Sequence, residues 1–138
     1  MRLSFLTLPM AAVALTCASV PVPAQDAPAI PPLQTQGAAS FTCGGIGLGS
    51  SKAMLAARKD YPLSLLFASS NGEYMASVNL TIKDAKGASV LSVPSTGPIC
   101  LVKLPEGRYT VEGQALGKTK SQRVAIDGAP KAVDFTFQ

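Results

Sequence analysis

The chain of 138 residues contains no histidine and no tryptophan, and only 14% of its residues are charged. Without histidine, Ser-His-Asp and Cys-His catalytic machinery and zinc sites built on histidine are excluded. Three carboxylates are the candidates for acid–base catalysis: Glu73, Glu106 and Glu112. They are expected beside turns or on an exposed strand face, where a carboxylate is far more often a solvated surface group than a catalytic acid or base. We therefore expect no enzyme, no metal site and no cofactor.

Hydrophobic, glycine and proline residues make up most of what is present. Hydrophobic residues account for 47% of the chain, and it has 12 glycines and 11 prolines. This length accommodates one domain. A composition low in charge and rich in Gly and Pro favours many turns between short strands over a helical bundle.

Residues 1–24 have the layout of a secretory signal peptide. Arg2 supplies a positive charge, an apolar stretch follows from Leu3 to Val20, and small residues stand at Val22 and Ala24. Cleavage is expected before Gln25, so that the protein is exported to the periplasm. After cleavage no membrane span is expected to remain.

Two alternatives to cleavage at this site stay open. The apolar stretch is near the length of a membrane span, although Pro9 and several Ser and Thr residues weaken that interpretation. Lipid attachment at Cys17 is the second alternative. The preceding sequence, Ala14-Leu15-Thr16, fits the bacterial lipoprotein pattern poorly.

The basic residues give little support to nucleic-acid binding. Removal of Arg2 leaves 11 basic against 8 acidic residues, a net charge of +3. They are scattered, and no aromatic residues alternate with them as in a nucleic-acid interface. Lys118, Lys120 and Arg123 form one loose group that could attract an acidic envelope polymer. Such a group is more often the solvated face of an edge strand.

Cysteines indicate a disulfide. The mature chain keeps Cys43 and Cys100, an even pair in a protein bound for an oxidising compartment. The alternative is two free buried thiols. A bond between them would tie the first ordered segment to a central strand.

The segment before the domain is rich in proline, and a glycine cluster follows it. Residues 25–40 are expected to form an extended tether, because Pro28, Pro31 and Pro32 block both helix and strand pairing. The glycines at 44–49 do not have the spacing of a phosphate-binding loop. They predict a tight turn, after which Ser50 or Ser51 caps a short helix that ends near Lys59.

From Pro62 onward the pattern is β. Alternation is cleanest in "YMASVNLTIKD", where Ala76, Val78, Leu80 and Ile82 share one face. Asn71-Gly72 is a strong hairpin signal, and Pro105-Glu106-Gly107 predicts another turn. The sequence therefore predicts an all-β, seven-stranded sandwich of the immunoglobulin-like kind with one short N-terminal helix. The expected strands span residues 62–69, 74–84, 88–93, 99–104, 108–113, 118–126 and 131–138.

A family resemblance adds to this prediction. The stretch "LPEGRYTV" at residues 104–111, preceded by "VNLTIKDAKGASVL" and followed by "GKT", resembles the carboxypeptidase regulatory-like domains. These are transthyretin-like seven-stranded sandwiches with a Leu-Pro-x-Gly-x-Tyr turn, here Leu104, Pro105, Gly107 and Tyr109. Glu106 stands where a second proline is frequent. The chain is similar to small exported proteobacterial proteins of that family over residues 43–137.

The resemblance implies a domain over residues 41–138 and no catalytic residues, because such domains are accessories to some carboxypeptidases. Two functional hypotheses remain. The first is a non-catalytic periplasmic module for protein interaction or structural support, with another envelope protein as its partner. The alternative is a carbohydrate-binding module of the same sandwich fold. It is disfavoured because exposed aromatic residues are few. The sequence itself identifies no ligand-binding residue.

Overall fold

The structure, a computed structural model, describes residues 9–21 and 29–138. Residues 9–21 contain no helix or strand and are exposed throughout. The positive start of the predicted signal peptide and its cleavage site at Ala24–Gln25 lie outside the described residues, as does Pro28. Within the two described ranges, no helix has the length and apolar character needed to cross a membrane.

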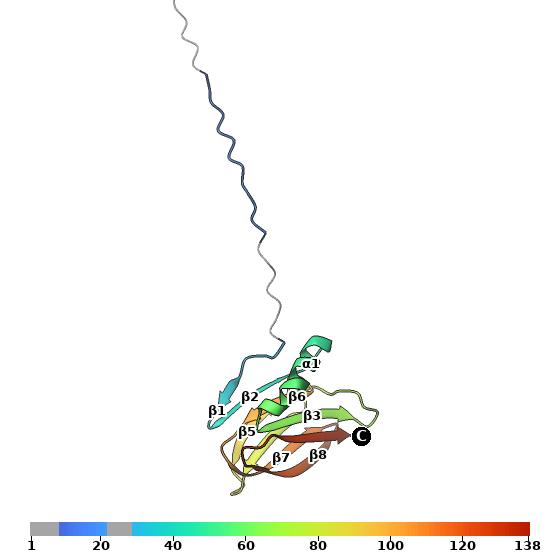
Figure 1. Cartoon of the computed structure of the whole chain (residues 1–138). Coiled ribbons are helices and arrows are strands. Elements are labelled where there is room, and N and C mark those ends of the chain that lie inside the picture. Colours follow the sequence, from blue (N-terminus) through green and yellow to red (C-terminus); the bar gives the residue numbers. More distant parts are fainter. Residues whose placement is uncertain (1–8, 22–28) are drawn as a thin grey trace, which may run out of the picture.

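Residues 29–138 form a sandwich of two β-sheets with one helix (Figure 1). The five-stranded sheet has the order β1-β2-β6-β3-β9, and the four-stranded sheet has the order β5-β4-β7-β8. All neighbouring strands are antiparallel except β3 and β9. The strands are β1 (Gln34–Gln36), β2 (Ala39–Gly44), β3 (Leu63–Ser69), β4 (Asn79–Asp84), β5 (Ser89–Pro94), β6 (Ile99–Lys103), β7 (Gly107–Ala115), β8 (Lys118–Ile126) and β9 (Lys131–Phe137).

Alternating apolar residues build the core between the two sheets, as the sequence pattern predicts. In β9, Val133, Phe135 and Phe137 are buried, while the residues between them are exposed. The ring of Phe135 stacks on that of Phe67 from β3, with 5.8 Å between the ring centroids. The all-β sandwich with a short helix is therefore confirmed.

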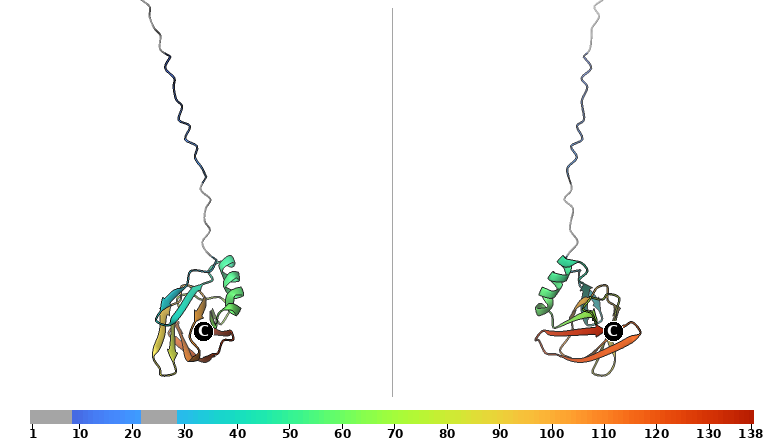
Figure 2. Two further views of the ribbon diagram at one scale, coloured as in Figure 1. Left: turned by 60° about the vertical axis from the view of Figure 1, so that its left-hand side comes forward. Right: turned by 90° about the vertical axis from the view of Figure 1, so that its right-hand side faces the viewer.

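The helix α1 (Leu48–Ala57) covers the outer side of the five-stranded sheet (Figure 2). Its buried residue Met54 packs against Ile99 and Leu101 of β6. The alternate residues of β6, Cys100 and Val102, face the core between the sheets. Strand β6 is therefore buried on both faces, which explains why "ICLV" is apolar without interruption.

The predicted number of seven strands is wrong, because residues 29–138 form nine. The two additional strands are β1, which precedes the expected domain, and β2, which overlaps its start. Both begin within residues 25–40, so the proline-rich tether is shorter than predicted and the sandwich begins before residue 41. The polar strand β1 pairs with β2. The side chain of its residue Gln36 also forms hydrogen bonds with the backbone of Ser92 in β5.

A short hairpin forms at Asn71-Gly72, as predicted, but the chain then crosses to the other sheet before β4 begins. Gly72 closes a turn with Ser69, and one bridge forms between Ala68 and Tyr74. Ser77 then adopts a positive φ of 61°, which redirects the backbone, so that β3 and β4 belong to different sheets. The alternation of the predicted strand is confirmed from Val78 onward.

The start of the helix also differs from the prediction. The helix begins at Leu48 with Gly47 at the N-cap, and no side chain caps it. Ser50 lies inside the first turn, where its hydroxyl accepts a bond from the Gly45 amide and donates one to the Ala29 carbonyl oxygen. A short 3-10 helix, η1 (Arg58–Asp60), follows α1.

The disulfide between Cys43 and Cys100 is present. The two cysteines are directly opposite each other in the antiparallel pair β2–β6, and their Cα atoms are 4.1 Å apart. This close spacing is typical of the non-hydrogen-bonded positions of such a pair. The bond therefore fastens β2 to β6, the central strand of the five-stranded sheet, as expected.

Candidate functional site

An apolar depression of about 400 Å³ lies at one end of the sandwich. Three segments form it: the turn from β2 into α1, the crossing from β3 to β4, and the loop before β6. We call it the loop-end hollow. Its lining residues are Gly45, Ile46, Gly47, Leu48, Ser51, Tyr74, Ala76 and Pro98.

Backbone contacts fix the loops around the hollow. The Thr96 hydroxyl donates to the Cys43 carbonyl oxygen at 3.1 Å, next to the disulfide. Gly97 packs so closely on Gly44 that a Cβ atom there would overlap the Gly44 carbonyl group. These two contacts hold the end of β2 against the loop before β6.

Large apolar side chains are exposed at the hollow. Leu48, Ile46 and Tyr74 have relative exposures of 72%, 69% and 47%. None of the lining residues is charged. A concave apolar surface of this kind suits an uncharged apolar group of a ligand or partner.

The "LPEGRY" segment connects β6 of the five-stranded sheet to β7 of the four-stranded sheet. Leu104 is buried after the end of β6, and β7 starts at Gly107, whose φ of +155° is on the glycine-favoured side. The Tyr109 hydroxyl donates to the Pro105 carbonyl oxygen at 2.8 Å. Burial, and secondarily the charge of Asp84, raises the pKa of Tyr109 above 10.0. The Tyr109 hydrogen bond therefore closes the turn between β6 and β7.

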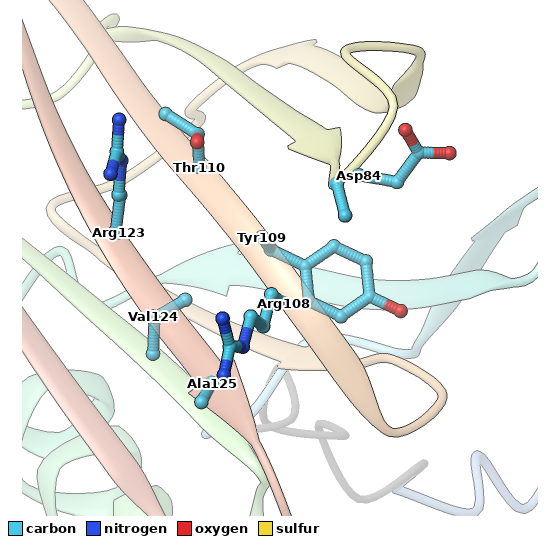
Figure 3. A pocket seen from close by; sticks show the side chains of 8 residues that line it. Asp84, Arg108, Tyr109, Thr110, Arg123, Val124 and Ala125 are labelled. Carbon is cyan, nitrogen blue, oxygen red and sulfur yellow. The ribbon is translucent and has the colours of Figure 1, made fainter.

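A second concavity, of about 530 Å³, lies along β7 and β8 (Figure 3). Thr110 is opposite Arg123 in this strand pair, and Arg108 is opposite Ala125. We call it the basic groove, because it carries two arginines against one carboxylate. Its lining residues are Asp84, Ala85, Arg108, Tyr109, Thr110, Arg123, Val124 and Ala125.

The group Lys118, Lys120 and Arg123 lies on β8, at the edge of the four-stranded sheet. This confirms that the three residues belong to an edge strand. None of the ion pairs found in residues 29–138 involves them: those pairs join Arg58 to Asp134, Lys83 to Glu112 and Lys131 to Asp127.

The carboxylates do not gather into a centre. Glu112 pairs with Lys83 at 3.3 Å, whereas Glu73 and Glu106 are exposed beside turns. Backbone and Lys131 hydrogen bonds lower the pKa of Asp127, which lies in the turn before β9. The described part of the chain has no group of three or more His, Cys, Asp or Glu side chains that could hold a metal ion.

Comparisons with known proteins assign no family. No protein-family model matches the chain, and no curated protein matches it. Among solved structures, the Bacillus anthracis TIE protein is similar with a TM-score of 0.45 and 14% sequence identity. The match covers 55% of this chain and 16% of that protein. A similarity of this strength carries no argument about function, and the resemblance to carboxypeptidase regulatory-like domains remains a proposal.

The sequence does not predict the loop-end hollow. Ile46 and Leu48 fall within the predicted glycine turn, and Tyr74 is the first residue of a predicted strand. The available signal was local: Ile46 and Leu48 are large apolar residues separated by glycines, outside any regular hydrophobic period.

Proposed function

We propose that the chain is an exported, non-catalytic module that acts in the periplasm through protein interaction. The loop-end hollow is the proposed contact surface, and its occupant is an uncharged apolar side chain of another envelope protein. The exposure of Ile46, Leu48 and Tyr74 around one uncharged concavity is the observation that carries this proposal. Exposed apolar patches of this kind mark contact sites more often than isolated exposed leucines do.

Two further observations support the proposal. A disulfide is typical of proteins in oxidising compartments, which agrees with export. The sequence resemblance to carboxypeptidase regulatory-like domains would place the chain among non-catalytic accessory sandwiches. The glycan-binding alternative has one supporting observation, the half-exposed ring of Tyr74.

Site-specific photo-cross-linking in the native host tests the proposal. A photoreactive residue in place of Ile46 is expected to give a discrete cross-linked protein band. The same residue in place of Lys86, which is exposed in the turn between β4 and β5 and does not line the hollow, is expected to give none. The absence of a band specific to position 46 would contradict the proposal.

A charge substitution provides the matched control. Leu48→Asp is expected to remove the cross-link at position 46, while Leu116→Asp is expected to keep it. Leu116 is another exposed leucine, with a relative exposure of 65%, and it does not line the hollow. A glycan array with the purified domain addresses the alternative: a glycan bound by the wild type but not by Tyr74→Ala would favour it.

A further inference from the structure

The four sheet edges differ in how far they are open. Strand β5 is covered by Gln36, whose side-chain amide accepts a bond from the Ser92 amide at 2.7 Å and donates to the Ser92 carbonyl oxygen at 3.5 Å. Strand β1 has only three residues. The long open edges are those of β8 and β9.

Charge distinguishes these two open edges. On β9, Lys131 pairs with Asp127 and Asp134 pairs with Arg58, so both charges are balanced locally. Strand β8 carries three cations and no carboxylate, and none of the ion pairs among residues 29–138 reaches it. We call this strand the basic edge.

The basic edge has the geometry of a strand template. Its nine residues pair with β7 in continuous register, without the bulge that interrupts the pairing of β4 with β5. Strand side chains alternate between faces, so Lys118 and Lys120 flank the edge on one face and Arg123 on the other. Arg108 of β7 adds a cation beside Arg123 in the basic groove.

We propose that the β8 edge binds an acidic, extended polypeptide segment by strand addition. Backbone hydrogen bonds would extend the four-stranded sheet, and carboxylates of the segment would pair with Lys118, Lys120 and Arg123. Because the cations flank both faces, the segment is expected to carry acidic residues at consecutive positions. A segment with acids only at alternate positions would reach one face alone.

The charge also accounts for selectivity. Lysine on an edge strand normally prevents edge-to-edge association. Here the same cations repel a second copy of β8 and any basic strand, whereas an acidic strand removes the repulsion. The inference concerns a surface different from the loop-end hollow, so it stands or fails separately from the proposed function.

Titration of the isotopically labelled mature domain with a synthetic peptide tests the inference. The probe is a ten-residue peptide of consecutive Glu residues flanked by Val and Thr, and its counterpart has Lys in place of Glu. The acidic peptide is expected to shift the backbone amide signals of residues 118–126 and to slow their hydrogen exchange. Its Kd is expected to rise at least about tenfold between low salt and about 0.5 M salt, because the pairs are exposed to solvent.

Charge-reversal variants separate strand addition from general attraction. The triple variant Lys118→Glu, Lys120→Glu, Arg123→Glu is expected to lose at least about tenfold in affinity for the acidic peptide and to gain affinity for the Lys peptide. The control Lys52→Glu, Lys59→Glu places similar charge changes on α1 and η1, and it is expected to keep wild-type affinity. A variant at the hollow, Leu48→Asp, is expected to bind the peptide as the wild type does.

Three results would overturn the inference. One is an absence of amide shifts on β8. Another is equal loss of affinity in the α1/η1 control. The third is binding of an acidic polysaccharide such as polygalacturonate with the same affinity and no slowing of β8 hydrogen exchange, which would show attraction of a polyanion without strand addition.

Discussion

Tyr109 closes the turn between β6 and β7 through a single hydrogen bond. Its ring is buried at the start of β7, and its hydroxyl reaches back to the carbonyl oxygen of Pro105, just after β6. One side chain thus holds one of the connections in which the chain changes sheets. The Leu-Pro-x-Gly-x-Tyr turn motif has a tyrosine at position 109, and the hydrogen bond to Pro105 gives a physical reason for it.

Tyr109→Phe is expected to lower the free energy of unfolding by about 0.5–1.5 kcal/mol, the usual contribution of one hydrogen bond. The pKa of Tyr109 is raised in the folded state, so the folded state holds the phenolic proton more tightly than the unfolded state. This contribution is complete below about pH 10 and is lost as the pH rises through the folded-state pKa. Urea unfolding from about pH 8 to about pH 11 should show the loss in the wild type and a smaller loss in the variant. If the free energy of unfolding fell equally with rising pH in the wild type and in Tyr109→Phe, this prediction would be contradicted.

Gly97 is a position where any Cβ atom is excluded. Gly97→Ala is expected to lower the free energy of unfolding by about 1–3 kcal/mol, because the backbone of Gly44 must move. The matched control is Gly49→Ala in α1, which has open space around it and is expected to stabilise by about 0.5–1 kcal/mol. Thermal unfolding of both variants checks the pair, and equal effects would contradict the packing argument.

Strands β2 and β6 are linked both by antiparallel strand pairing and by the disulfide. Cys100→Ser is expected to lower the free energy of unfolding by about 2–4 kcal/mol, since the closed loop of 57 residues is released. Adding Cys43→Ser should cost little more, because the bond is already lost. Denaturant midpoints of both single variants and the double variant measure this, and additive losses would indicate two independently packed thiols.

The hairpin of β7 and β8 has an unfavourable residue in its turn. Leu116 and Gly117 both have positive φ, 54° and 70°, and Leu116 is exposed. Asparagine tolerates this conformation much better than leucine. Leu116→Asn is therefore expected to raise the unfolding temperature by a few degrees, an increase of about 0.5–1 kcal/mol. A lowered temperature would mean that Leu116 makes a stabilising contact.

The sequence predicts elements best where burial alternates along a strand. The residues of β9 and those from Val78 to the end of β4 follow that rule, and both segments were predicted as strands. Strand β1 is entirely polar, and its position depends on Gln36 reaching Ser92, 56 residues away. The local sequence pattern does not predict a contact between residues so far apart. The same holds for Ser77, whose positive φ separates β3 from β4.

At the scale of the molecule, composition predicted the sandwich but not the site. Many turns, few charges and an even pair of mature cysteines already favour a disulfide-linked β-domain. The loop-end hollow arises from three segments that are far apart in sequence, so only the assembled fold brings Ile46 near Tyr74. Leu48 is a candidate contact residue because its side chain is exposed, and this exposure could not be predicted from the sequence.

Processing determines what precedes the folded domain. The predicted mature protein begins at Gln25, which leaves residues 25–28 before Ala29, where the Ser50 hydroxyl bonds to the chain. Intact-mass measurement of periplasmic material is expected to match residues 25–138. A mass matching an acylated chain that begins at Cys17 would instead establish a lipoprotein, and retention of the whole leader would indicate an uncleaved anchor.

The position of the disulfide also determines how the molecule would respond to mechanical force. Cys43 and Cys100 are 57 residues apart, so a pull on the two ends of the chain bypasses everything between them. At about 3.4 Å per extended residue, roughly 190 Å of chain is withheld from stretching. Only the segments before Cys43 and after Cys100 can lengthen. The turn that carries Ile46 and Leu48, the helix, and strands β3 to β5 bear no tension along the backbone until the sulfur–sulfur bond is reduced.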